Sequence, residues 1–168
     1  MDRDLHQIYE TYARDVYCFL LRMCCDEELA KDLLQDTMLK AIAAINDFQG
    51  GCSIRTWLFS IAKNLYYDHL KRADRRDLPL DSIPEPEAAE SFTEQLTDAD
   101  TALHIHRLLH TLDEPYREVF SLRVFAELSF RDIGAVFGKN GNWAGVTFFR
   151  AKQKLIERMK EEGLYDKD

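Results

Sequence analysis

The chain of 168 residues lacks a long hydrophobic run and lacks the usual marks of export. Its longest dense apolar stretch, VYCFLL at 16–21, is far shorter than the about 20 residues that a helix needs to cross a bilayer. The charged start, MDRDLHQ, has no apolar core of the kind found in signal peptides. We therefore expect a cytoplasmic protein that does not insert itself into a membrane.

The sequence also lacks paired cysteines of a metal-binding or disulfide type. Its four cysteines, Cys18, Cys24, Cys25 and Cys52, form neither a CxxC pair nor a zinc-type doublet. This pattern favours reduced thiols in a reducing compartment. Redox sensing by Cys52 is an alternative, although no nearby residue in the sequence clearly lowers the pKa of its thiol.

Signs of catalysis are equally sparse. The sequence contains no glycine-rich phosphate loop. His106, His110 and Glu114 have the four-residue spacing of one helical face, which can bind zinc, and His104 lies close by. The sequence shows no general base or substrate pocket to accompany them. We expect no enzymatic activity, cofactor or metal, with a zinc site as an alternative hypothesis.

Basic residues are absent from one segment, 78–101. This segment has seven Asp or Glu residues, no Lys or Arg, and prolines at positions 79, 84 and 86. Prolines interrupt helices and like charges repel, so the segment is typical of a linker. It divides the chain, whose formal net charge is −8, into units 1–77 and 102–168.

Both units lack the alternating pattern of strands and show helical periodicity instead. Apolar residues recur every three or four positions in 5–23, and a second helix is expected after CCDEE, with one face formed by Leu29, Leu33, Thr37, Ala41 and Ile45. A third helix, toward the basic end LKRADRR, carries an apolar stripe of Ile54, Trp57, Leu58, Ile61 and Leu65. We predict an all-α protein of two small helical domains joined by an acidic, flexible linker.

The C-terminal unit has the form of a helix-turn-helix. Pro115 suits a first helical turn, Ser129 and Asp132 have capping-box form, Gly138 can end one helix, and Asn140 can cap the next. In that last helix Ala144, Phe148, Ala151 and Leu155 form a stripe that we expect to be buried. The opposite face carries Asn142, Val146, Phe149, Arg150 and Gln153.

This opposite face offers amide and guanidinium groups that can bond to base edges, with lysines nearby for phosphates. Gly145 on its flank either lets DNA approach closely or is simply tolerated in the helix. A solvated basic surface is the alternative for this helix, because basic helical faces are common on small bundles.

Three blocks resemble one family. The chain is similar to sigma factors of bacterial RNA polymerase, most of all the extracytoplasmic-function (ECF) group. The blocks that carry this resemblance are DLLQDTMLKAI (32–42), SIRTWLFSIAKNLYYDHLKR (53–72) and LSFRDIGAVFGKNGNWAGVTFFRAKQKL (128–155). The resemblance implies that 1–77 is a region 2 domain, which binds the polymerase clamp and opens the −10 element. It implies that 102–168 is a region 4 domain, which reads the −35 element and binds the flap.

The resemblance also implies roles for individual residues. Core polymerase contacts are expected at Asp32, Gln35 and Asp36. Met38 is also expected to lie off the apolar stripe of its helix and to belong to the same patch. The −10 element is expected to meet Gly50, Gly51, Cys52, Ser53, Arg55, Lys63, Asn64, Tyr67, Asp68, Lys71 and Arg72. Arg75 and Arg76 are further candidates for phosphate contacts, whereas Trp57 is expected to have a core role. The −35 element is expected to meet Asn142, Trp143, Val146, Thr147, Phe149, Arg150, Gln153 and Lys154.

Two other functions fit the same sequence. An autonomous helix-turn-helix regulator would form dimers and bind a specific DNA site without polymerase. A protein-interaction module would use the basic face to bind an acidic partner. The family resemblance itself implies core RNA polymerase, promoter DNA and an anti-sigma factor as partners.

Overall fold

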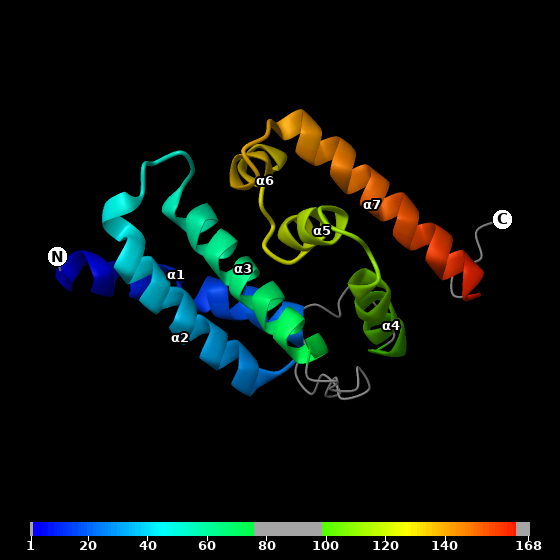
Figure 1. Ribbon diagram of the computed structural model, residues 1–168, viewed down its shortest axis with the longest axis horizontal. Helices are drawn as coiled ribbons and strands as arrows, with labels where there is room; N and C mark the ends of the chain where they lie inside the picture. Colours follow the sequence, from blue (N-terminus) through cyan, green and yellow to red (C-terminus); the bar gives the residue numbers. More distant parts are fainter. Residues whose placement is uncertain (1, 76–98, 164–168) are drawn as a thin grey trace. The chain divides into compact units, whose positions relative to one another are not determined.

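The computed structural model describes residues 2–75 and 99–163, with side chains from Leu5 to Ala73 and, Ile105 apart, from His104 to Gly163. These residues form two compact helical units, and no strand occurs among them (Figure 1). The prediction of an all-α protein with two helical domains is therefore confirmed. None of the helices in the described ranges has the length and apolar character needed to cross a membrane.

The N-terminal unit contains α1 (Asp2–Cys24), α2 (Glu27–Ala44), the short 3₁₀ helix η1 (Ile45–Asp47) and α3 (Ile54–Arg75). Helix α2 begins at Glu27, inside the CCDEE sequence rather than after it, because Asp26 is the N-cap. The Asp26 carboxylate accepts hydrogen bonds from the backbone N–H groups of Glu28 and Leu29. The acidic first turn also suits the positive end of the helix dipole.

Helices α1, α2 and α3 pack against one another, and their shared core has an aromatic centre. Phe19 and Phe59 meet edge to face with ring centroids 5.1 Å apart, and both are buried. The predicted faces of α1 and α2 are largely confirmed, with Val16, Leu33 and Ala41 buried.

The expected stripe on α3 is only partly right. Leu58 is buried as expected, but Ile54, Ile61 and Leu65 are half-buried. The buried positions of α3 include instead Phe59, Ala62, Tyr66 and Tyr67. Because α3 contacts both α1 and α2, its buried surface is wider than one stripe and is centred elsewhere.

The C-terminal unit contains α4 (Ala99–His110), α5 (Tyr116–Val124), α6 (Phe130–Val136) and α7 (Gly141–Glu161). The long helix α7 packs against the other three, so it forms the spine of this unit. Helix α4 starts at Ala99, so it includes the last three residues of the predicted linker, 99–101. Pro115 precedes α5 as its N-cap residue rather than standing in the first turn. The rest of the predicted linker, 78–98, lies outside the described residues.

The turn between α6 and α7 follows the local chemistry expected from the sequence. The Ser129 hydroxyl accepts a hydrogen bond from the Asp132 N–H, and the Asn140 side chain accepts one from the Trp143 N–H. Gly138 has φ +65, a left-handed conformation that suits glycine, just after α6 ends. These two caps and the glycine fix where α6 begins and ends and where α7 begins.

Gly134 is a further requirement of this turn, which the sequence reasoning missed. A Cβ at this position would lie 2.5 Å from the Asn140 carbonyl oxygen and 2.8 Å from that of Lys139. Both atoms belong to the backbone, so neither can rotate away. The absence of a side chain at Gly134 therefore lets the turn fold back closely onto α6.

Candidate nucleic-acid interface

Helix α7 presents the face that the sequence assigned to DNA. Asn142, Val146, Phe149, Arg150 and Gln153 are not buried, and Val146 and Phe149 are the most exposed large apolar side chains among the described residues of this unit. Ala144, Ala151 and Leu155 are buried on the other side, which confirms most of the expected stripe. Phe148, the fourth member, is half-buried and packs against the rings of Phe120 and Phe130 at centroid distances of 5.7 and 5.6 Å.

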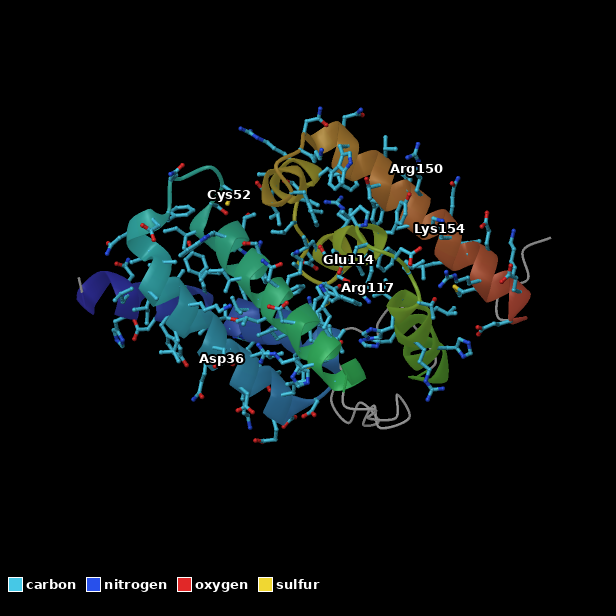
Figure 2. All side chains as sticks on the ribbon, viewed as in Figure 1. Asp36, Cys52, Glu114, Arg117, Arg150 and Lys154 are labelled. Carbon is cyan, nitrogen blue, oxygen red and sulfur yellow. The ribbon has the colours of Figure 1, made fainter. Side chains whose placement is uncertain are left out.

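Three other residues assigned to the −35 element are placed differently from this exposed face. Thr147 is buried, and its hydroxyl donates a hydrogen bond to the Trp143 carbonyl at 2.7 Å, so it is corrected to an internal position. The ring of Trp143 packs against that of Phe137, with centroids 5.3 Å apart. Lys154 is exposed, with its ammonium 5.1 Å from the centre of the Tyr116 ring. Figure 2 shows Lys154 and Arg150 along α7.

The electrostatic character of α7 changes along its length. No residue from Gly141 to Phe149 carries a charge, whereas Arg150, Lys152 and Lys154 follow within five residues. The N-terminal half of the face is therefore amide and apolar, and the adjoining segment is cationic. Such a surface can present contacts to base edges beside contacts to phosphates.

Gly145 lies on the flank of this face. A Cβ there would lie 3.6 Å from the ring of Phe130, an ordinary van der Waals distance. Its missing side chain is thus directed at α6, and an alanine would fit. This geometry favours simple tolerance of glycine over a need for close approach by DNA.

In the N-terminal unit, the loop before α3 presents small residues. Gly50 and Gly51 are exposed, Cys52 is half-buried (Figure 2), and Gly50 has φ +72. The Ser53 hydroxyl accepts a hydrogen bond from the Thr56 N–H, which caps the start of α3. The loop is anchored on its other side by Phe48, whose ring packs on Trp57 at 5.0 Å. Trp57 therefore has the packing role expected for it.

The residues of α3 assigned to the −10 element separate into exposed and internal ones. Asn64, Asp68, Lys71 and Arg72 are exposed. Lys63 and Tyr67, which were also expected to meet the −10 element, are instead buried, with exposed fractions of 5% and 4%. The wide buried surface of α3 includes both. The Arg75 side chain and the whole of Arg76 lie outside what the structure describes.

Arg55 has partners within the fold. Its Nε lies 3.5 Å from the Asp15 carboxylate of α1, and its guanidinium lies 4.7 Å from the centre of the Phe59 ring. This side chain links α1 to α3. A phosphate contact by Arg55 would compete with these interactions.

The patch on α2 contains the three residues assigned to core polymerase. Asp32 and Asp36 belong to its solvent-facing side with Gln35, and Asp36 is labelled on α2 in Figure 2. Met38 is buried, with an exposed fraction of 6%, so its expected place on this patch was wrong. It turns instead toward an apolar groove that Leu5, Ile8 and Trp57 also line.

Two apolar residues belong to the same exposed face of α2, and the sequence reasoning did not name them. Leu39 is 65% exposed and Ile42 is 46% exposed. Both lie off the Leu33–Thr37–Ala41 stripe, so the helical period contained the signal that would have found them. The α2 patch therefore combines carboxylates with exposed aliphatic groups.

The histidines and cysteines do not form a metal centre in the described part of the chain, which holds no group of three suitable ligands. The rings of His106 and His110 are in contact, with centroids 4.8 Å apart, while Glu114 pairs with Arg117 (Figure 2). His104 contacts Glu162, which follows α7. Burial raises the pKa of the Cys24 thiol to about 12 and also raises that of Cys25, which disfavours reactive thiolates there.

Comparisons with known proteins match both units. The family model for sigma-70 region 2 matches residues 8–76, and the model for sigma-70 region 4 matches residues 103–155. Together they cover most of the chain. The corresponding helices are α1 to α3 in the first match and α4 to α7 in the second.

Individual relatives and a solved structure point to the same family as these models. The sigma factor CarQ of Myxococcus xanthus is 30% identical over 163 residues, covering 92% of this chain and 88% of CarQ. The ECF sigma factor SigM of Bacillus subtilis is 28% identical over 156 residues, covering 90% of this chain and 92% of SigM. The sigma factor RpoE of Bartonella quintana, solved with the anti-sigma factor NepR, has the same fold, with a TM-score of 0.67, 24% identity and coverage of 94% and 98%. The chain therefore belongs to the ECF group of the sigma-70 family, whose members direct core RNA polymerase to promoters.

Proposed function

We propose that the two units of this sigma factor divide promoter recognition, with α7 reading the −35 element. The observation that carries this proposal is the accessible face of Asn142, Val146, Phe149, Arg150 and Gln153 on the second helix of a helix-turn-helix. Residues at the start of such a helix reach base edges in the major groove. Phosphate contacts then come from Lys154 and its basic neighbours.

The N-terminal unit, in this proposal, holds the −10 element. The Gly50–Ser53 loop accepts a base flipped from the non-template strand, and the exposed Asn64 and Asp68 follow along α3, one turn apart. Flipping a base costs a few kcal/mol, which contacts in the loop must offset. Exposed Lys71 and Arg72 supply the positive charge for the single strand.

Core polymerase, we propose, binds the α2 patch through Asp32, Gln35 and Asp36. Exposed Leu39 supplies an apolar contact beside these polar groups, as is usual for a stable protein interface. The C-terminal unit contacts the flap, and the acidic segment 78–101 connects the two units. An anti-sigma factor is a further proposed partner, since a similar fold was solved in such a complex.

The protein acts, in this proposal, in the cytoplasm and by binding alone, with no catalytic step of its own. Its effect on chemistry is to place the polymerase at a start site. An autonomous regulator would instead need only its own helix-turn-helix and a dimer.

In vitro transcription with core polymerase tests the proposal. Start-site-specific transcripts are expected only when the protein is added. Asp36→Arg is expected to weaken binding to core polymerase, measured by fluorescence anisotropy of labelled protein. Glu157→Arg, the same change of charge at an exposed position of α7, is expected to leave core binding intact. Arg150→Ala is expected to preserve core binding but reduce initiation.

Two results would contradict the proposal. One is the absence of specific transcripts with an intact, folded protein and active core enzyme. The other is tight binding of a specific site by a dimer of the free protein, which would support the autonomous regulator.

A further inference from the structure

Two exposed apolar side chains stand together on the recognition face of α7. Val146 is 41% exposed and Phe149 is 59% exposed, and they lie three residues apart on one side of the helix. Large apolar side chains seldom gather on a surface without a partner. The Phe149 ring also packs edge-on against the Phe148 ring, with centroids 5.9 Å apart, and this contact helps to hold it in position.

The surroundings of this pair indicate what it meets. Arg150 directly follows Phe149, and the exposed Lys152 and Gln153 come next. Positive charge next to an apolar pair complements a duplex groove, where phosphates border the base edges. A protein partner of Val146 and Phe149 would gain from these neighbouring cations only if its own surface were acidic.

The chemistry of the base edges then narrows down which base Val146 and Phe149 contact. Guanine is usually read by Arg or Lys, and the segment 141–149 contains neither. Thymine alone among the four bases presents a methyl group in the major groove, and Phe is among the side chains that contact it. Asn142, one turn before Val146, has the amide that pairs with adenine.

We infer that Val146 and Phe149 read thymine through its 5-methyl group in the −35 element. This inference rests on the proposed function of α7. It assigns the central part of the face to apolar readout and leaves the phosphate contacts to the cationic segment that follows.

The test uses holoenzyme made from the full chain and core polymerase. Active promoters are first selected from templates randomised across the −35 segment, and thymine is expected at the positions most strongly enriched. Each selected template is then compared with a copy carrying uracil in place of thymine in that segment. Uracil pairs identically but lacks the methyl group, so initiation is expected to fall about threefold for each recognised methyl group that the template lacks.

Variants separate methyl readout from general binding. Phe149→Ala is expected to weaken initiation on thymine templates and bring the thymine-to-uracil ratio close to one, and Val146→Ala is expected to lower that ratio in part. Lys152→Ala is the matched control on the same helix. It is expected to weaken both templates equally and to reduce the dependence on salt, with the ratio unchanged.

The failures are distinguishable. Specific transcripts with equal activity on thymine and uracil templates would overturn the inference and leave the proposed function standing. A thymine preference that persists in both apolar variants would also overturn it, because the methyl groups would then be read elsewhere. No specific transcript from any template would overturn the proposed function and this inference together.

Discussion

Helices α3 and α7 are nearly equal in length, at 22 and 21 residues, but they bury different widths of their surface. The buried residues of α7 are Ala144, Thr147, Ala151 and Leu155, a single narrow stripe. Those of α3 include adjacent pairs, such as Leu58 with Phe59 and Tyr66 with Tyr67. A narrow stripe leaves most of a helix free to bind, whereas a wide one draws polar residues into the core.

The difference has a consequence for binding. On α7 the accessible residues recur from Asn142 to Gln153 along one side, so one helix can make a continuous contact. On α3 the accessible candidates for DNA contact are Asn64, Asp68 and the basic end of the helix. Under the proposed function, we therefore expect contacts with the −10 element to depend more on the preceding loop than contacts with the −35 element depend on any loop.

The largest expected effect comes from Gly134, because it sets α6 against the start of α7. Gly134→Ala places a methyl group 2.5 Å from the Asn140 carbonyl oxygen, so the turn must open. We expect a loss of about 3 kcal/mol in the local stability of α6 and α7. Amide hydrogen exchange of the full chain measures this loss, with α1 to α3 as the internal control. Unchanged protection in α6 and α7 would contradict the tight turn.

Lowering the pH is expected to affect stability through a buried histidine more than through an exposed one. Burial lowers the pKa of His110 to about 4, helped by nearby His106 and by the Arg117 guanidinium. The unfolded chain, with an ordinary histidine pKa of about 6.5, then binds more protons between pH 4 and 6.5. Stability of the C-terminal unit should therefore fall as the pH drops through that window, by about 2–3 kcal/mol from this residue.

Hydrogen exchange of the wild type and His110→Gln at pH 7 and pH 5 measures this dependence after correction for the intrinsic exchange rates. The variant should lose part of the difference between the two pH values. His69→Gln, an exposed histidine of α3, serves as the control and should behave like the wild type. An equal pH dependence in all three proteins would show that His110 is not held neutral by burial.

Lysines on α3 provide a direct test of its wide buried surface. Lys63→Ala should destabilise the N-terminal unit by about 1–2 kcal/mol, since the buried aliphatic stem is removed. Lys71→Ala, on the exposed side, should leave stability unchanged and weaken promoter opening, with a smaller dependence on salt. Hydrogen exchange and transcription assays at several salt concentrations distinguish the two. If Lys63→Ala behaves like Lys71→Ala, Lys63 faces DNA after all.

The same contrast explains which parts of the molecule could be predicted from sequence. Ser129, Gly138 and Asn140 act through their nearest neighbours along the chain, so local rules identified the turn between α6 and α7. The α7 stripe obeyed a simple helical period because its contacts lie on one side. The family resemblance then supplied functional roles that no local rule contains.

The errors have a common physical cause. Lys63, Tyr67 and Met38 are internal because helices distant in sequence cover them, and a period read along one helix does not contain that information. Gly134 was missed for the same reason, since its constraint comes from carbonyl groups beyond the end of its own helix. Contact with DNA or polymerase by the remaining site residues stays a prediction.

The smallest expected effect concerns Gly145. It distinguishes an effect of this position on the stability of α7 from a role in contact with DNA. An alanine Cβ would lie 3.6 Å from the Phe130 ring, so Gly145→Ala should stabilise the helix by up to about 1 kcal/mol. Promoter initiation should stay unchanged, because the added methyl group faces α6. Hydrogen exchange of α7 and transcription from one promoter measure the two quantities. A more stable helix with weaker initiation would mean that DNA approaches the backbone at Gly145, and that the binding face of α7 is wider than its exposed side chains indicate.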